Sequence, residues 1–160
     1  MTNFTRKDFH EYLNNIYKNE KKDIIFLHCD AWKFHSNTYQ MISCGVQEPN
    51  MLNIAAGMML SGKTVIVYSQ AGFVLEKCME QFRLVLPDTG HLILLNAGNH
   101  GEYPSNLGKG HNFSINLLRK YYEFLGFRIF DLKENPDTSI SSVFKFNDKV
   151  NKHLVLLGKE

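Results

Sequence analysis

The sequence lacks the features that mark several classes of protein. It has three cysteines, Cys29, Cys44 and Cys78, whose odd number and wide spacing provide neither a disulfide framework nor the close doublets of a structural zinc site. The longest apolar stretches, such as residues 54–60, are far shorter than the roughly 20 residues of a membrane-spanning helix. Residues 1–10 are polar and mixed in charge, unlike a secretory leader. We therefore expect a cytoplasmic protein with reduced thiols.

A large excess of one charge is also missing. The chain has 18 basic and 16 acidic residues, a formal net charge of +2 at pH 7, and no long block of one sign. This balance argues against a dedicated nucleic-acid or membrane-surface binder. The chain has 160 residues, of which 44% are hydrophobic and 21% charged, as is typical of a single globular domain with a buried core.

The apolar pattern predicts alternating helices and strands. Residues 5–17 have helical spacing, whereas residues 23–29 form a short apolar run that suits a strand buried on both faces. The expected helices cover 5–17, 49–60, 74–84, 112–126 and 138–146, and the expected strands cover 23–29, 64–69, 91–95, 127–130 and 153–157. This order predicts an α/β fold in three layers, a parallel sheet with helices on both faces, and a functional site at the carboxyl ends of the strands.

One motif match is misleading in its context. Residues 57–64, GMMLSGKT, satisfy the phosphate-loop pattern GxxxxGK[ST]. That loop binds phosphate only when it follows a strand and opens a helix, because the helix N-terminus must point at the anion. Here a helix is expected before the loop and a strand after it. We therefore interpret the match as a helix end and a tight turn, with Lys63 in solvent.

A longer segment carries a specific resemblance. Residues 45–63 read GVQEPNMLNIAAGMMLSGK and closely resemble the segment GIAEQNMVGIAAGLALSGK of transketolases and deoxyxylulose-phosphate synthases. The EQFR of residues 80–83 and the GKGH of residues 108–111 resemble the D/E-Q-I-R and G-P-T-H elements of that family. The resemblance extends over essentially all of residues 1–160, as one pyrimidine-binding domain. It therefore implies the thiamine-diphosphate-binding fold.

The resemblance implies a cofactor site around Glu48. This residue matches the glutamate that hydrogen-bonds the aminopyrimidine ring of thiamine diphosphate and favours the imino tautomer that removes the thiazolium proton. A carboxyl group in an apolar cleft is easier to protonate, whereas a helix start favours its charged form, and the sequence does not decide between them. The ring also needs an aromatic wall. Tyr68 is the first candidate and Phe73 the second, although either could belong to the core.

Four further residues match substrate-binding positions of the family. Arg6 matches an arginine that binds the sugar phosphate, and Asp30 matches an acid at the end of the first strand. His111, which is also a candidate catalytic residue, and His100 match histidines that face the sugar. The family's later R-P-x-D element has no clean counterpart, and Ile115 stands where an acid is usual. These departures favour a specialised ketol transferase.

The family's GDG…N segment, which holds the diphosphate and magnesium, does not occur in the sequence. The resemblance therefore implies no metal site in this chain and a separate diphosphate-binding partner subunit that supplies the magnesium. Together the two chains would form a split transketolase-like enzyme, a dimer of heterodimers, which transfers a two-carbon ketol unit between sugars. The donor and acceptor sugars, and whether the acceptor is linked to a nucleotide, stay open.

Two alternatives use the same module. One is a subunit of a thiamine-dependent 2-oxo acid decarboxylase or lyase. The loop that carries His111 argues against this alternative, because sugar hydroxyls need such donors and a small oxo acid does not. The other is a non-catalytic scaffold subunit, against which the intact Glu48 counts.

Overall fold

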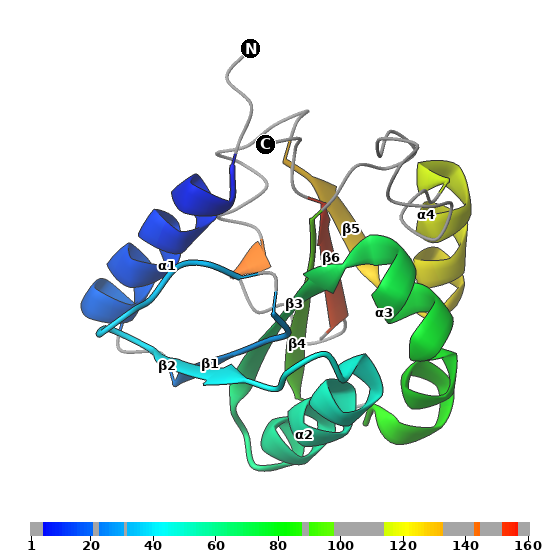
Figure 1. Ribbon diagram of the computed structural model, residues 1–160, viewed down its shortest axis with the longest axis horizontal. Helices are drawn as coiled ribbons and strands as arrows, with labels where there is room; N and C mark the ends of the chain where they lie inside the picture. Colours follow the sequence, from blue (N-terminus) through cyan, green and yellow to red (C-terminus); the bar gives the residue numbers. More distant parts are fainter. Residues whose placement is uncertain are drawn as a thin grey trace.

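A computed structural model describes most of the chain (Figure 1). The described residues are 5–20, 23–30, 32–87, 90–97, 114–132, 143–144 and 152–156. The helices are α1 (Arg6–Glu20), α2 (Glu48–Leu60), α3 (Ala71–Lys77) and α4 (Ile115–Phe124), together with the π-helix η1 (Gln81–Val85). The strands are β1 (Ile24–His28), β2 (Gln40–Ser43), β3 (Thr64–Gln70), β4 (His91–Ala97), β5 (Arg128–Asp131) and β6 (Lys152–Leu156).

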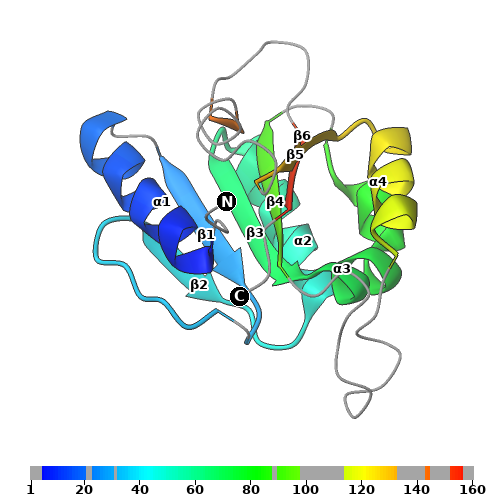
Figure 2. The ribbon, with the colours of Figure 1, turned by 90° about the horizontal axis from the view of Figure 1, so that it is seen from above.

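The described residues form a six-stranded sheet in the order β2-β1-β3-β4-β6-β5, and every neighbouring pair is parallel. The inner strands β1 and β3 are buried almost throughout, which explains their continuous apolar runs. Helices cover both faces, with α1 on one side and α2, α3 and α4 on the other (Figure 2). The α/β fold predicted from the sequence is confirmed.

Each face of the sheet has its own hydrophobic core. On the side of α2, the inward residues of β3 are Val65 and Val67, which pack with Met51 and Leu52. On the side of α1 the alternate residues of the same strand, Ile66 and Tyr68, pack in a second core together with Phe9 and Trp32 among others. Successive side chains of a strand point to opposite faces, so position along β3 decides which core a residue enters.

Three elements differ from the sequence prediction. The edge strand β2 was not predicted, because its four residues are polar or only half-buried and give no apolar run. The helix expected over residues 74–84 is divided into α3 and the π-helix η1. Helix α2 begins at Glu48, so Pro49 is its second residue rather than its first. Of the helix expected over residues 138–146, only residues 143–144 are described.

Candidate functional site

The carboxyl ends of β1 and β2 meet where α2 begins. The two strands pair in register from Ile25 with Gln40 to His28 with Ser43, and the backbone N–H of Cys44 donates to the carbonyl of His28 over 2.8 Å. The chain then turns at residues 44–47 and enters α2. In parallel α/β proteins ligands bind at this edge of the sheet, so the start of α2 is the first place to look for a site.

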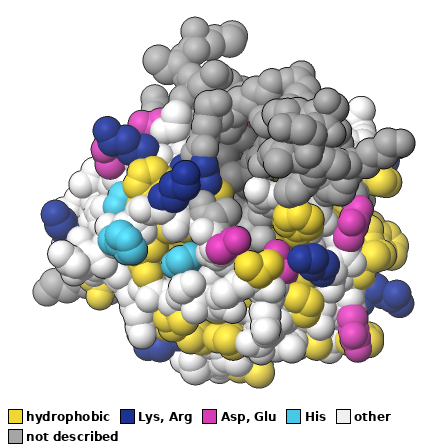
Figure 3. All heavy atoms as spheres, viewed as in Figure 1, with side chains coloured by type: hydrophobic (Ala, Val, Ile, Leu, Met, Phe, Trp, Pro, Cys, Tyr) yellow, Lys and Arg dark blue, Asp and Glu magenta, His cyan; other side chains and the backbone are white. Residues whose placement is uncertain are grey.

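A pocket of about 450 Å³ lies at the start of α2. Its lining combines amide, carboxylate and ammonium groups with apolar side chains: Val46, Gln47, Glu48, Pro49, Asn50, Asn53 and Lys77. Figure 3 shows acidic, basic and hydrophobic side chains next to one another on one face of the molecule. A concave surface with a few convergent polar groups is the usual form of a small-molecule site.

Glu48 is the buried charged group of this pocket. Glu48 as a whole is only 2% exposed, and its carboxylate oxygen Oε2 lies 3.2 Å from Nζ of Lys77. Glu48 is also in the first turn of α2, where the helix dipole favours negative charge, and the residue before it, Gln47, makes no side-chain cap. The ion pair and the helix start therefore both stabilise the charged carboxylate.

The thiols of Cys29 and Cys78 lie close enough to Glu48 for its charge to affect their pKa values. Burial raises the pKa of the Cys29 thiol, and the charge of Glu48 raises it further. The same two causes, in the same order, raise the pKa of Cys78 to about 12. Cys29 also contacts Met51, with 3.9 Å between the sulfur atoms. Two neutral, polarizable thiols therefore lie near the buried carboxylate and add no charge to its surroundings.

Phe73 is brought to Glu48 through Lys77. The ammonium group of Lys77 lies 4.6 Å from the centroid of the Phe73 ring, within the range of a cation–π contact. The same ammonium group pairs with Glu48, so one nitrogen connects the carboxylate and the aromatic ring. Phe73 is half-buried and keeps part of its surface accessible. Of the two aromatic candidates, Phe73 is the one linked to the carboxylate in this way.

Tyr68 lies in the opposite core. It is 1% exposed, belongs to the cluster on the α1 side, and makes an edge contact with Trp32 at 4.7 Å between ring centroids. Its phenol oxygen accepts a hydrogen bond of 2.7 Å from Nη1 of Arg6. The structure thus brings Arg6 and Tyr68 together but does not bring them to Glu48. The ring of Tyr68 is enclosed by protein in this chain.

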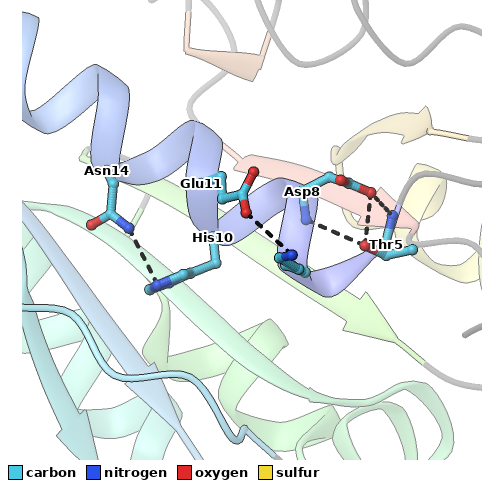
Figure 4. A network of polar contacts seen from close by, with 6 residues as sticks. Thr5, Asp8, His10, Glu11 and Asn14 are labelled. Atoms are coloured by element: carbon cyan, nitrogen blue, oxygen red, sulfur yellow. Dashed lines mark hydrogen bonds and ion pairs between the residues drawn. The ribbon is translucent and has the colours of Figure 1, made fainter.

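The start of α1 fixes the place of Arg6. Thr5 precedes the helix, and its backbone N–H and its hydroxyl both donate to the carboxylate of Asp8 over 2.7 Å (Figure 4). The backbone N–H of Asp8 donates back to the Thr5 hydroxyl over 3.3 Å. These hydrogen bonds lower the pKa of Asp8 and form a capping box that defines the first turn. Arg6 is therefore the first residue of a helix whose N-terminus is capped.

Of the remaining predicted site residues, only Asp30 is described, and it is not among the residues that line this pocket. Asp30 is exposed, two residues beyond the end of β1. His100 and His111 lie outside the described residues. Within the described ranges, no group of three or more His, Cys, Asp or Glu side chains could hold a metal ion. In the same part of the chain, none of the helices has the length and apolar character needed to cross a bilayer.

The phosphate-loop match occupies the turn that the sequence predicted. Helix α2 ends at Leu60, Gly62 has a φ of +83°, and β3 starts at Thr64, so the order is helix, turn, strand. Lys63 was expected in solvent, and this expectation was wrong in part: Lys63 forms an ion pair with Asp23 and is partly buried. A lysine held by a carboxylate at the amino end of β3 has no role in a phosphate cradle.

Lys77 is the residue of the pocket that sequence reasoning missed. In the sequence, Lys77 lies within the helix expected over residues 74–84, and nothing there indicates a role at Glu48. No spacing rule connects it to Glu48, which lies 29 residues earlier. The signal that was present is indirect: α3 directly follows β3, so this helix starts at the same sheet edge as α2, and Lys77 is its last residue.

Comparisons with known proteins agree with the architecture. No protein-family model matches the sequence, and no curated protein does. A solved structure described as "Split gene transketolase, inactive beta4 tetramer" has a TM-score of 0.71 to this chain at 15% sequence identity. The fold is transketolase-like. The match covers 100% of this chain and 53% of the other, so the chain spans about half the length of that neighbour. At the start of α2, a buried carboxylate such as that of Glu48 can exchange a proton or accept a hydrogen bond from a nitrogen base.

Proposed function

We propose that this chain is the pyrimidine-binding subunit of a split, thiamine-diphosphate-dependent, transketolase-like enzyme. The observation that carries the proposal is the buried carboxylate of Glu48, which lines a pocket at the carboxyl edge of a parallel sheet. Residues 45–63 resemble the corresponding transketolase segment, in which this glutamate binds the cofactor. The transketolase-like fold supports the same assignment.

The residues around the pocket fit an aminopyrimidine. A carboxylate that is 3% exposed at its side chain can accept a ring N–H or give a proton to a ring nitrogen, and water competes little there. Phe73 offers a ring close to the same carboxylate, against which a heterocycle could stack. When bound, thiamine diphosphate supplies an electron sink for cleavage of a carbon–carbon bond. Glu48 would hold the ring and carry its proton.

The partner and the sugar are further parts of the proposal. The described residues contain no metal-binding group, and the sequence has no GDG segment, so a second subunit would bind the diphosphate and magnesium. The neighbour's description as a split-gene transketolase supports a partner subunit, and its beta4 tetramer, without that partner, is described as inactive. The dimer of two-chain units is proposed from the family resemblance. Arg6, Asp30, His100 and His111 are proposed to contact a sugar or sugar-phosphate donor and acceptor, so that a two-carbon ketol unit is transferred.

The test is substitution of Glu48 in the complex with a diphosphate-binding partner subunit. Glu48→Gln keeps the size of the side chain but removes its ability to exchange a proton. We expect turnover to fall by about 100-fold or more, because a general acid–base group contributes on the order of 10²–10⁴ in rate. Glu76→Gln, at an exposed glutamate of α3 that does not line the pocket, is the matched control and should retain most activity. Size-exclusion chromatography should show intact complexes for both variants.

The same assay separates the alternatives. A ketose donor with an aldehyde acceptor reports ketol transfer, whereas a 2-oxo acid reports decarboxylation or lyase activity. A scaffold subunit would leave turnover unchanged after Glu48→Gln. Activity within tenfold of wild type would therefore overturn the proposed role of Glu48, and turnover of 2-oxo acids alone would replace the sugar by that substrate class.

A further inference from the structure

The ammonium group of Lys77 occupies the place in the pocket where the proposed ligand would need to bind. Its Nζ lies 3.2 Å from Oε2 of Glu48 and 4.6 Å from the centroid of the Phe73 ring. These are the two protein groups that the proposed function assigns to an aminopyrimidine, one for hydrogen bonding and one for stacking. In the separate chain, Lys77 therefore contacts both of the groups that are proposed to bind the ligand.

The two ends of this ion pair differ in their surroundings. The side chain of Glu48 is 3% exposed and is held by the first turn of α2, whereas the side chain of Lys77 is 43% exposed at the last residue of α3. A lysine side chain has several freely rotating bonds and can move its ammonium group into water with little change in free energy. Glu48 is fixed, so any rearrangement of the pair is a movement of Lys77.

A protonated ring nitrogen and an ammonium group compete for the same carboxylate. Each is a cationic donor, and two like charges beside one carboxylate in a half-buried site repel each other. The other groups near Glu48 do not relieve this competition, because the Cys29 and Cys78 thiols are neutral at ordinary pH. The aminopyrimidine can therefore engage Glu48 fully only after Lys77 has left.

We infer that Lys77 is a displaceable counter-ion of Glu48, which keeps the buried carboxylate charged and paired in the isolated subunit and gives way to the aminopyrimidine ring. This inference rests on the proposed function. Without the lysine, the separate chain would contain an unpaired buried carboxylate, a strongly destabilising arrangement. With the lysine, the chain folds with its site already formed, and ligand binding exchanges one cationic donor for another.

The first measurement follows the side-chain carboxyl carbon of Glu48 in the full chain by NMR at one pH. Lys77→Met removes the ammonium group that lies 3.2 Å from the carboxylate and keeps the apolar stem, so the chemical shift of this carbon should differ from wild type. Lys77→Arg keeps the charge and should leave the chemical shift close to wild type. Lys63→Met removes the lysine of another carboxylate pair, with Asp23, and should not change the Glu48 signal.

The second measurement uses the free aminopyrimidine half of thiamine, whose ring nitrogen can be protonated, in a chemical-shift titration of the same chains. Lys77→Met should bind the probe about two- to fivefold more tightly than wild type, because a competing donor worth up to about 1 kcal/mol is gone. Lys77→Arg and Lys63→Met should bind no more tightly than wild type. The thiazole half of thiamine serves as the negative ligand.

The outcomes separate the inference from the function on which it rests. A changed Glu48 carboxyl signal together with tighter binding in Lys77→Met supports the inference. Binding of the probe by Lys77→Met that is equal to or weaker than in wild type overturns it, whatever the Glu48 signal, and the Glu48→Gln assay then still tests the proposed function. Binding by none of the chains overturns the inference and also counts against an aminopyrimidine as the ligand. Should Lys77→Met fail to fold, Lys77→Gln is measured in its place under the same criteria.

Discussion

The guanidinium group of Arg6 donates a hydrogen bond of 2.7 Å to the phenol oxygen of Tyr68, which lies 62 residues further along the chain. The contact joins the first turn of α1 to the carboxyl half of β3. The guanidinium carbon of Arg6 also lies 5.9 Å from the centroid of the Tyr68 ring. This pair anchors α1 on its own face of the sheet, opposite the face that bears Glu48.

Tyr68→Phe tests how much this anchor stabilises the fold. The change removes the phenol oxygen from a side chain that is almost fully buried and leaves its partner without this acceptor. We expect the free energy of unfolding to fall by about 1 kcal/mol, the usual net value of one hydrogen bond, with a similar denaturant slope. Urea unfolding measures both quantities. Tyr17→Phe, which removes a half-buried hydroxyl from α1, should change stability by less, and an equal loss would contradict the assignment.

Gly90 allows β4 to approach α2. Its φ is +95°, and a Cβ built there would lie 2.8 Å from Cβ and 2.9 Å from the carbonyl oxygen of Met59. We expect Gly90→Ala to lower the free energy of unfolding by about 1–3 kcal/mol, because it combines an unfavourable backbone conformation with overpacking. Thermal or urea unfolding checks this value.

Gly57→Ala is the contrasting substitution. Gly57 lies inside α2, and a Cβ built on it has no other atom within 4 Å. Alanine should therefore raise the free energy of unfolding by about 0.5–1 kcal/mol, since it favours the helix and restricts the unfolded chain. A loss of stability would show that this position, the first glycine of the phosphate-loop match, requires glycine.

His10 should make stability depend on pH. Burial lowers the pKa of His10 below its ordinary value of 6.5, and its Nδ1 lies 2.7 Å from the Tyr39 phenol oxygen. The unfolded chain then binds a proton at a higher pH than the folded chain does. The contribution of His10 to the free energy of unfolding is therefore complete above about pH 6.5. It is lost as the pH falls through the lower pKa that His10 has in the folded state. His10→Gln should flatten the stability profile over this range, measured by urea unfolding at several pH values. His35→Gln, at an exposed position, should leave the profile unchanged.

The three thiols should react in a fixed order with iodoacetamide at about pH 8. Cys44 is half-buried, and burial raises its pKa. Cys29 and Cys78 are buried, and the charge of Glu48 adds to the effect of burial on their pKa values. We expect Cys44 to be modified first, as mapped by peptide mass spectrometry, and all three to react alike in denaturant. Modification of Cys78 as fast as Cys44 would contradict the buried placement.

The sequence by itself determined the alternation of helices and strands and therefore the class of fold. Strands β1, β3 and β4 are buried on both faces, so their apolar runs are continuous and easy to recognise. Strand β2 lies at the edge of the sheet and has no such run, which is why it escaped prediction. The π-helix η1 escaped because its composition does not differ from that of an ordinary helix.

For the candidate site, the sequence determined Glu48, since local chemistry and a matched segment identify a carboxylate at a helix start. The tertiary structure decided its surroundings. It brought Lys77 to the carboxylate from another helix and, through this lysine, linked Phe73 rather than Tyr68 to the pocket. The reason is geometric: alternate residues of a strand face opposite sides of a sheet, and only the packed chain decides which helices cover each side.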